Sequence, residues 1–138
     1  MVKFVDVETP YMDEDHGNVA RNILYARACV RDSLMRGETP FALNIFYSQP
    51  GIIDDSVSDE RRIAIQTVDK LIGAFPDAVT AVYEDLGISK SMQYGIDRAT
   101  LSRRKVEFRK LGEGWLEREL AIAGNHSQAS VWGIHPTD

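Results

Sequence analysis

The sequence predicts an α/β domain with a Rossmann-like parallel sheet, and three observations favour this fold class. Between residues 2 and 109, segments with strand character alternate with segments whose apolar residues have helical spacing. Such a succession builds a parallel sheet through right-handed crossovers, with helices on both sides. The length of 138 residues suits one domain, and 43% hydrophobic residues are enough for a packed core. We expect a three-layer sandwich around a sheet of four to five strands.

The first predicted strand and helix lie before residue 38. Residues 2–8 are rich in β-forming residues and are followed by Thr9 and Pro10, which stop the strand. After a loop, Asn18 is the expected N-cap of a helix that Gly37 ends. The apolar positions of its expected buried face are Val19, Ile23, Ala26 and Val30.

The middle of the chain predicts two more strands around a second helix. Residues 40–47 form a nearly continuous apolar run, which is typical of a strand buried on both faces. Ser58 is expected to begin the helix and Pro76 to end it, before a strand over residues 78–83. The expected buried residues of this helix are Ala64, Val68, Leu71 and Phe75.

The last third predicts a helix capped by Ser89, an edge strand over residues 106–109 and a small helix over 115–122. The expected buried residues of the first of these helices are Met92, Ile96 and Ala99. Few apolar residues follow. Residues 1–123 are therefore expected to form the domain, and residues 124–138 a tail or an arm that contacts other copies in an oligomer.

Charge and cysteine content limit the classes of partner. The formal net charge is −5, which gives no general attraction to nucleic acid or anionic membranes, so neither is an expected partner. The basic cluster at residues 103–110 is expected to be a solvated face. A single cysteine, Cys29, allows no internal disulfide and is expected to be a buried apolar residue. Without a signal peptide or a long apolar run, a cytoplasmic location is expected.

Chemistry in an open α/β sheet is expected beyond the carboxyl ends of the strands. Ser89 and Ser91 could bind a phosphate or a sugar hydroxyl there, although Ser89 as a plain helix cap is the simpler interpretation. Tyr11 and Tyr47 follow strands and could stack on a base or pack in the core. An acidic loop favours solvated side chains over a metal site, and we expect no metal and no cofactor. Its residues are Asp13, Glu14, Asp15 and His16.

Six segments of the sequence together resemble a known family, and they are residues 9–11, 17–27, 37–40, 44–47, 54–61 and 87–99. The family that they resemble is the nucleoside 2-deoxyribosyltransferase-like proteins, and within it a small bacteriophage branch. The resemblance implies a flavodoxin-like parallel fold, a nucleoside or nucleotide ligand and homo-oligomers. Together with the strand-end argument, it predicts a ligand-binding set of Thr9, Pro10, Tyr11, Asn18, Asn22, Tyr47, Ser89, Ser91 and Met92.

The same resemblance bears on catalysis. Enzymes of this family use a glutamate in the helix motif that begins at Ser89, and it attacks the sugar to form a glycosyl-enzyme intermediate. Gly95 stands at that position here, so the expected nucleophile is missing. Another carboxylate could replace it, and the candidates are Asp13, Glu14, Asp54, Asp55, Glu60 and Asp85.

These considerations favour a non-catalytic nucleotide-binding protein. By analogy it would sequester a nucleotide-derived signal, such as a cyclic nucleotide or an ADP-ribose derivative, for a phage in the host cytoplasm. The alternative is an N-glycosidase or deoxyribosyltransferase that acts on a nucleoside monophosphate with a relocated carboxylate. A protein-interaction module that uses residues 124–138 is a third class.

Overall fold

The computed structural model describes residues 2–10, 18–47, 49–54 and 57–125. Its centre is a sheet of four parallel strands in the order β2-β1-β3-β4. The strands are β1 (Phe4–Glu8), β2 (Thr39–Phe41), β3 (Val79–Tyr83) and β4 (Lys105–Arg109). The predicted fold class is therefore confirmed, with four strands in the sheet and β4 at one edge as expected.

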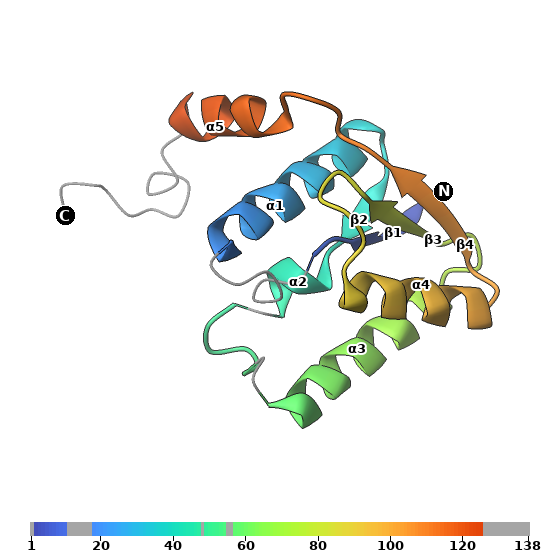
Figure 1. Ribbon diagram of the computed structural model, residues 1–138. Helices are drawn as coiled ribbons and strands as arrows, with labels where there is room; N and C mark the ends of the chain where they lie inside the picture. The colour runs from blue at the N-terminus through green and yellow to red at the C-terminus, as the bar shows by residue number, and fades with distance from the viewer. Residues whose placement is uncertain (1, 11–17, 48, 55–56, 126–138) are drawn as a thin grey trace.

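Helices cover both faces of this sheet (Figure 1). The helices are α1 (Val19–Met35), α2 (Leu43–Phe46), α3 (Ser58–Gly73), α4 (Lys90–Leu101) and α5 (Trp115–Asn125). α1 packs on one face with α5 beside it, whereas α3 and α4 lie on the other face. No helix in the described ranges combines the length and apolar character needed to cross a membrane.

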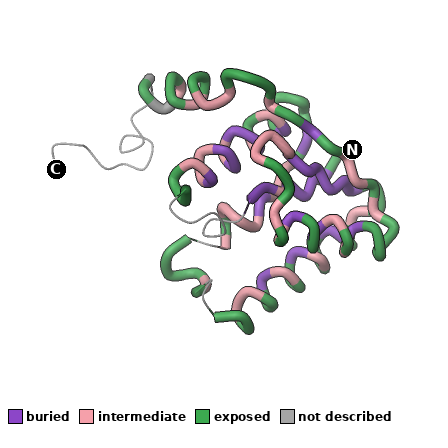
Figure 2. Tube along the Cα trace, viewed as in Figure 1, coloured by how far each residue is buried: buried purple, intermediate pink, exposed green. Residues whose placement is uncertain are grey.

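The alternation of side chains along β1 divides the core in two. The buried residues gather along the sheet and on the parts of the helices nearest to it (Figure 2). Val5 and Val7 pack with Tyr25 and Cys29 in the cluster under α1. Phe4 points the other way, into a cluster that contains Val68 and Ile72 of α3. Cys29 is fully buried, and burial raises the pKa of its thiol, so it is the apolar core residue that was expected.

The prediction of a long strand over residues 40–47 is wrong. β2 has only three residues, and α2 takes up most of the remaining run. An apolar run of this length has no period that separates a buried strand from a buried helical turn. Within the part of the chain that the structure describes, β2 is an edge strand that pairs with β1 alone, so no second neighbour extends it.

The helical faces differ in part from those predicted. In α1 the buried face is centred on Tyr25 and Cys29, and Val19 is exposed because it lies outside the part of the helix that contacts the sheet. In α3 Ile72 is buried in place of the exposed Leu71. α4 is capped as predicted, since the Ser89 hydroxyl accepts a hydrogen bond from the Met92 backbone N–H at 3.3 Å.

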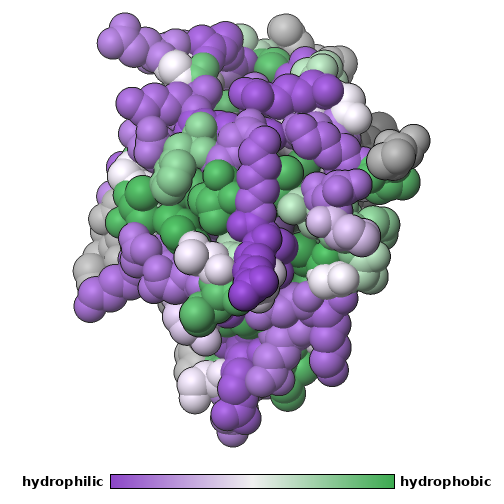
Figure 3. All heavy atoms as spheres, turned by 90° about the vertical axis from the view of Figure 1, so that its right-hand side faces the viewer, coloured by the Kyte–Doolittle hydropathy of each residue, from purple (hydrophilic) through white to green (hydrophobic). Residues whose placement is uncertain are grey.

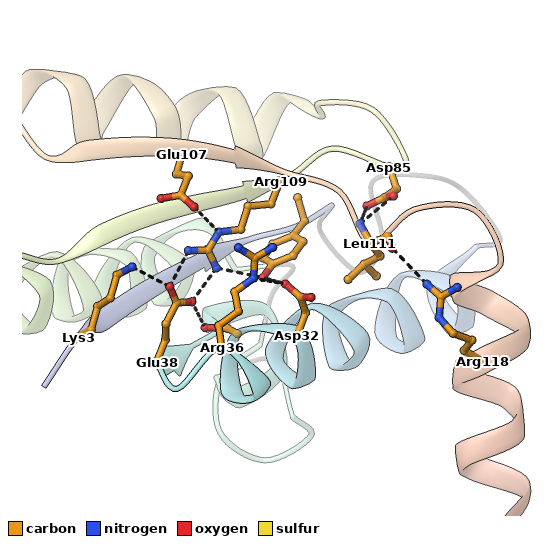
Figure 4. A network of polar contacts seen from close by, with 11 residues as sticks. Lys3, Asp32, Arg36, Glu38, Asp85, Glu107, Arg109, Leu111 and Arg118 are labelled. Atoms are coloured by element: carbon orange, nitrogen blue, oxygen red, sulfur yellow. Dashed lines mark hydrogen bonds and ion pairs between the residues drawn. The ribbon is translucent and has the colours of Figure 1, made fainter.

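Part of the basic cluster is buried, contrary to the predicted solvated face. Arg109 is 4% exposed and makes two parallel hydrogen bonds to the Glu38 carboxylate, 2.7 and 2.8 Å long (Figure 4). Lys3 completes the pairing of Glu38 at 3.0 Å. The guanidinium ion thus links β4 to the segment before β2 underneath α1, and this contact is why Arg109 faces inward.

The surface on the β4 side of the molecule is mixed in character (Figure 3). Hydrophilic side chains form a band across this face and separate its apolar atoms into patches. Scattered apolar atoms of this kind are ordinary for a protein surface.

Candidate functional site at the carboxyl edge of the sheet

The strand order places a topological switch point between β1 and β3. From β1 the chain continues through α1 to β2 on one side, and from β3 it continues through α4 to β4 on the other. The two central strands therefore send their connections in opposite directions, which opens a crevice at their carboxyl ends. Ligands of open α/β sheets bind in crevices at this position.

A cleft of about 550 Å³ lies at this switch point, and we call it the switch cleft. Pro10 after β1, Arg21 of α1 and residues 86–90 before α4 line it. Its volume is within the usual range for sites that bind small molecules, about 300 to 1,000 Å³. Arg21, Lys90 and the N-terminus of α4 bring positive charge to the cleft, so it suits an anionic group.

A second, much smaller hollow adjoins the cleft, and we call it the acid pocket. It is lined by Asp6, Glu8, Asn44, Arg61, Ser91, Tyr94 and Arg98, among others. Its volume of about 40 Å³ holds a few water-sized groups but no ring system. The hydroxyls of Ser89 and Ser91 lie 3.2 Å apart and connect the two spaces, because Ser89 lines the switch cleft and Ser91 the acid pocket.

Asp6 and Glu8 form a carboxyl pair at the base of the acid pocket. Residues two apart on a strand point to the same face, and here their side chains share a hydrogen bond. Burial raises the pKa of Asp6 to about 6, and the positive charges of Arg104 and Arg98 limit the rise. Burial and the negative charge of Asp6 raise the pKa of Glu8 well above its ordinary value. A hydrogen bond between two carboxyl groups needs a proton on one of them, and the raised pKa values favour keeping that proton within the pair.

Charged residues from three other parts of the fold surround this pair. Arg98 of α4 lies 3.2 Å from the Asp69 carboxylate of α3, and Arg104, in the turn before β4, lies 3.8 Å from it. The Thr80 hydroxyl donates to Asp6 at 3.4 Å. The Arg98 guanidinium also stacks on the exposed Tyr94 ring, at 4.7 Å from its centroid. The acid pocket thus contains both signs of charge beside an aromatic ring.

Gly95 supplies the space that the Glu8 carboxyl occupies. A Cβ at this buried position would lie 2.6 to 2.7 Å from the three carboxyl atoms of Glu8, too close for two atoms that are not bonded. Gly95 therefore does not leave an empty place on α4. The space in front of it contains a carboxyl group that comes from β1 instead.

α2 holds the end of β1 in place beside this pair. The Asn44 amide donates to the Thr9 carbonyl at 2.9 Å and to the Pro10 carbonyl at 3.4 Å. Thr9 is 1% exposed, and its hydroxyl has no hydrogen-bond partner among the described residues. The helical turn that replaced the predicted strand thus fixes the backbone that leaves Glu8.

The structure brings some members of the predicted ligand-binding set to this edge. Pro10 and Ser89 line the switch cleft, and Ser91 lines the acid pocket. Thr9 lies just beyond β1, between Glu8 of the acid pocket and Pro10 of the switch cleft. Asn18 is exposed at the start of α1 and makes no side-chain cap. Tyr11 lies outside the described residues.

Three other members of the set are packed among protein side chains. Met92 is fully buried, and Asn22 is 1% exposed within α1. Tyr47 packs edge-on against Phe46, with ring centroids 5.0 Å apart, so the core interpretation of this aromatic residue is favoured. Packing against the core separates these side chains from the two hollows.

None of the carboxylates proposed from sequence lines either hollow among the residues that the structure describes. Asp85 accepts hydrogen bonds from the backbone of Leu111 and Gly112, so it anchors the segment after β4. Glu60 accepts one from the backbone N–H of Asp54. Asp13, Glu14 and Asp55 lie outside the described residues, as does the rest of the acidic loop, Asp15 and His16. The described ranges contain no cluster of three or more potential ligands for a metal ion.

Asp6 and Glu8 were missed by the sequence reasoning, although the strand that carries them gave a signal. A central parallel strand is usually apolar on both faces, whereas β1 carries two acids on one face. Two buried carboxyls in a central strand need partners or protons, and such groups are frequent at functional sites.

Fold and site together define the class: an open parallel α/β protein with a polar crevice at its switch point. The chain belongs to the family described as domain of unknown function (DUF7768), whose family model matches residues 3–109. The matched range includes all four strands of the sheet and every residue that lines the two hollows. No curated protein and no solved structure matches the chain.

Proposed function

We propose that this protein binds a phosphorylated, nucleotide-like small molecule in the switch cleft and retains it without turnover. The observation that carries the proposal is the position of the cleft, between the carboxyl ends of β1 and β3 where their connections diverge. Lys90, Arg21 and the capped N-terminus of α4 favour an anionic group there. Sequestration of a nucleotide-derived signal is the physiological role consistent with such binding.

Calorimetric titration against nucleoside mono-, di- and triphosphates, cyclic nucleotides and ADP-ribose tests this proposal. At least one member is expected to bind with a Kd well below millimolar. If no member binds more tightly than millimolar, the proposal is wrong.

Lys90→Gln is expected to weaken binding of that nucleotide about 3- to 30-fold, because an exposed charge-assisted hydrogen bond to phosphate would be lost. Lys90 lines the cleft but caps nothing, so it is a cleaner choice than Ser89, whose removal also costs the helix about 1 kcal/mol. Lys70→Gln is the matched control, since Lys70 is exposed in the last turn of α3, near the opposite edge of the sheet. Equal weakening by both variants would remove Lys90 from the site.

A second candidate function is N-glycoside cleavage, and the carboxyl of Glu8 in front of Gly95 favours it. Glu8 would pass its proton to Asp6, and the resulting carboxylate would attack the anomeric carbon as the bond to the base breaks. The hydrogen-bonded pair is too close for the usual two-carboxylate mechanisms, which need about 5 Å or more between the carboxyls. Glu8 would thus act as the only nucleophile.

Chromatography of nucleoside monophosphates incubated with the protein separates the two functions. The proposed binder is expected to release no free base above the uncatalysed rate. If base does appear, Glu8→Gln is expected to lower its release at least about 100-fold, because the nucleophile is lost. Glu60→Gln is the control, since Glu60 lies outside both hollows.

A further inference from the structure

The two hollows differ in what they can accept. The switch cleft is large and bordered by Arg21 and Lys90, whereas the acid pocket is small and has the Asp6–Glu8 pair at its base. Asp6 is 3% exposed and Glu8 is half-buried, so Glu8 is the more accessible of the two to a ligand. The hydrogen bond between the two carboxyls requires a proton, which leaves the pair with one negative charge and with an acceptor oxygen on Glu8.

The charges around the pair come from every element packed against it. α3 contributes Asp69 and Arg61, α4 contributes Arg98, and the turn before β4 contributes Arg104. Asp69 is 3.2 Å from Arg98. The same carboxylate lies 3.8 Å from Arg104, so it offsets part of the positive charge near the pair. The pair's own negative charge disfavours an anionic group in direct contact with Glu8.

We infer that Asp6 and Glu8 act together as a specificity-determining pair, which accepts a hydrogen bond from an uncharged sugar hydroxyl and keeps the phosphate at the Lys90 end of the switch cleft. The pocket volume selects a hydroxyl over a base, since about 40 Å³ has no room for a ring. Glu8 lines the acid pocket and Pro10 lines the switch cleft. The two residues are two positions apart, which is roughly 7 Å along an extended chain. A phosphorylated sugar spans that distance.

Gly95 is needed for this pair because it leaves the space that the Glu8 carboxyl occupies. Any side chain at this position displaces the Glu8 carboxyl, whose three terminal atoms are the nearest to a Cβ there. Gly95→Ala should therefore leave the fold intact, because the end of a glutamate side chain can move, but it should separate the two carboxyls. Gly73→Ala is the matched control, because Gly73 is also helical and a Cβ there meets nothing within 4 Å.

The pair itself can be tested without a ligand, by carboxyl ¹³C NMR titration of the wild-type protein and both glycine variants. In the wild type and in Gly73→Ala, one carboxyl is expected to titrate near pH 6 and the other well above the ordinary value of a glutamate. In Gly95→Ala the two are expected to titrate closer to ordinary values. Two independent carboxyls that titrate below about pH 5 in the wild type would overturn the inference.

Selectivity, which rests on the proposed function, is tested with nucleoside 5′-monophosphates in ribo, 2′-deoxy and 3′-deoxy forms. Loss of either the 2′ or the 3′ hydroxyl is expected to weaken binding of the nucleotide to the wild type about 5- to 30-fold. The same loss should weaken binding to Glu8→Ala less than about 2-fold. An equal loss in both proteins, or none in either, overturns the assigned specificity. Absence of binding by all the nucleotides overturns the proposed function and this selectivity together, whereas the titration still decides whether the pair shares a proton.

Discussion

Replacement of Arg109 by methionine is expected to lower the free energy of unfolding by about 3 kcal/mol, near the lower end of what loss of one buried ion-pair partner costs. Glu38 has a side chain only 4% exposed and would lose two short hydrogen bonds. Lys3 and Ser33 would still contact it, which is why the lower end applies. Urea unfolding followed by circular dichroism measures the change.

Two further variants separate the buried pair from its surroundings. Lys3→Met removes the partner whose side chain is half exposed and is expected to cost less than about 1 kcal/mol. Replacement of both Arg109 and Glu38 by methionine is expected to recover much of the single variant's loss, because no buried charge remains uncompensated. If Lys3→Met costs as much as Arg109→Met, the bidentate contact is not the stabilising one.

The same pair predicts how stability changes in acid. Burial opposes ionisation of Glu38, but hydrogen bonds from Arg109, Lys3 and Ser33 outweigh it and lower the pKa to about 2, from an ordinary value of 4.5. An acid whose pKa is lower in the folded state stabilises that state above its unfolded pKa. This contribution should therefore be complete above about pH 5 and decline as the pH falls toward 2, with a smaller decline in Arg109→Met.

Gly95→Glu is expected to destabilise the protein, contrary to what helix propensity alone predicts. Removal of a helical glycine favours the helix by up to about 1 kcal/mol. Against this, the new side chain would overlap the Glu8 carboxyl, and overpacking of a core costs about 1 to 3 kcal/mol. A second carboxylate beside the Asp6–Glu8 pair adds repulsion, so the net effect should be a loss of stability.

The double variant Glu8→Ala with Gly95→Glu tests the cause of this loss. Removal of the Glu8 carboxyl vacates the space, so the double variant should be more stable than Gly95→Glu alone by about 1 to 3 kcal/mol. Thermal denaturation of the wild type, both single variants and the double variant gives the coupling free energy. Strict additivity would show that residues 8 and 95 do not compete for one space.

The sequence predicts most of the sheet because its information is local. Each strand except β2 is a short run between turn residues, and Ser89 caps α4 as its position before an apolar period indicates. β2 and α2 could not be separated, because residues 40–47 are apolar without a period. The neighbours of this segment in the sheet decide whether it forms a strand or a helical turn.

The sequence indicates where the candidate site lies but not which carboxyl groups it contains. Parallel topology places the strand ends at one edge, and Ser89 and Ser91 line the two hollows there. The contact of Glu8 with Gly95 joins β1 to α4, and nothing local to either segment encodes it. The substitute carboxylates that the sequence suggests lie in loops and at helix starts, whereas the carboxyl group of Glu8 lies on the central strand β1.

The central position of β1 has a consequence for synthesis of the chain. β1 pairs with β2 and with β3, and Asp6 lies 74 positions from its hydrogen-bond partner Thr80. Until the ribosome has made β3, the edge of β1 that pairs with β3 has no partner strand. Asp6 also lacks its contact with Thr80 at that stage. Contacts at such long sequence separation form slowly, because a long loop must close first. The carboxyl pair therefore remains hydrated until β3 and α4 emerge, and it loses water only when the sheet closes.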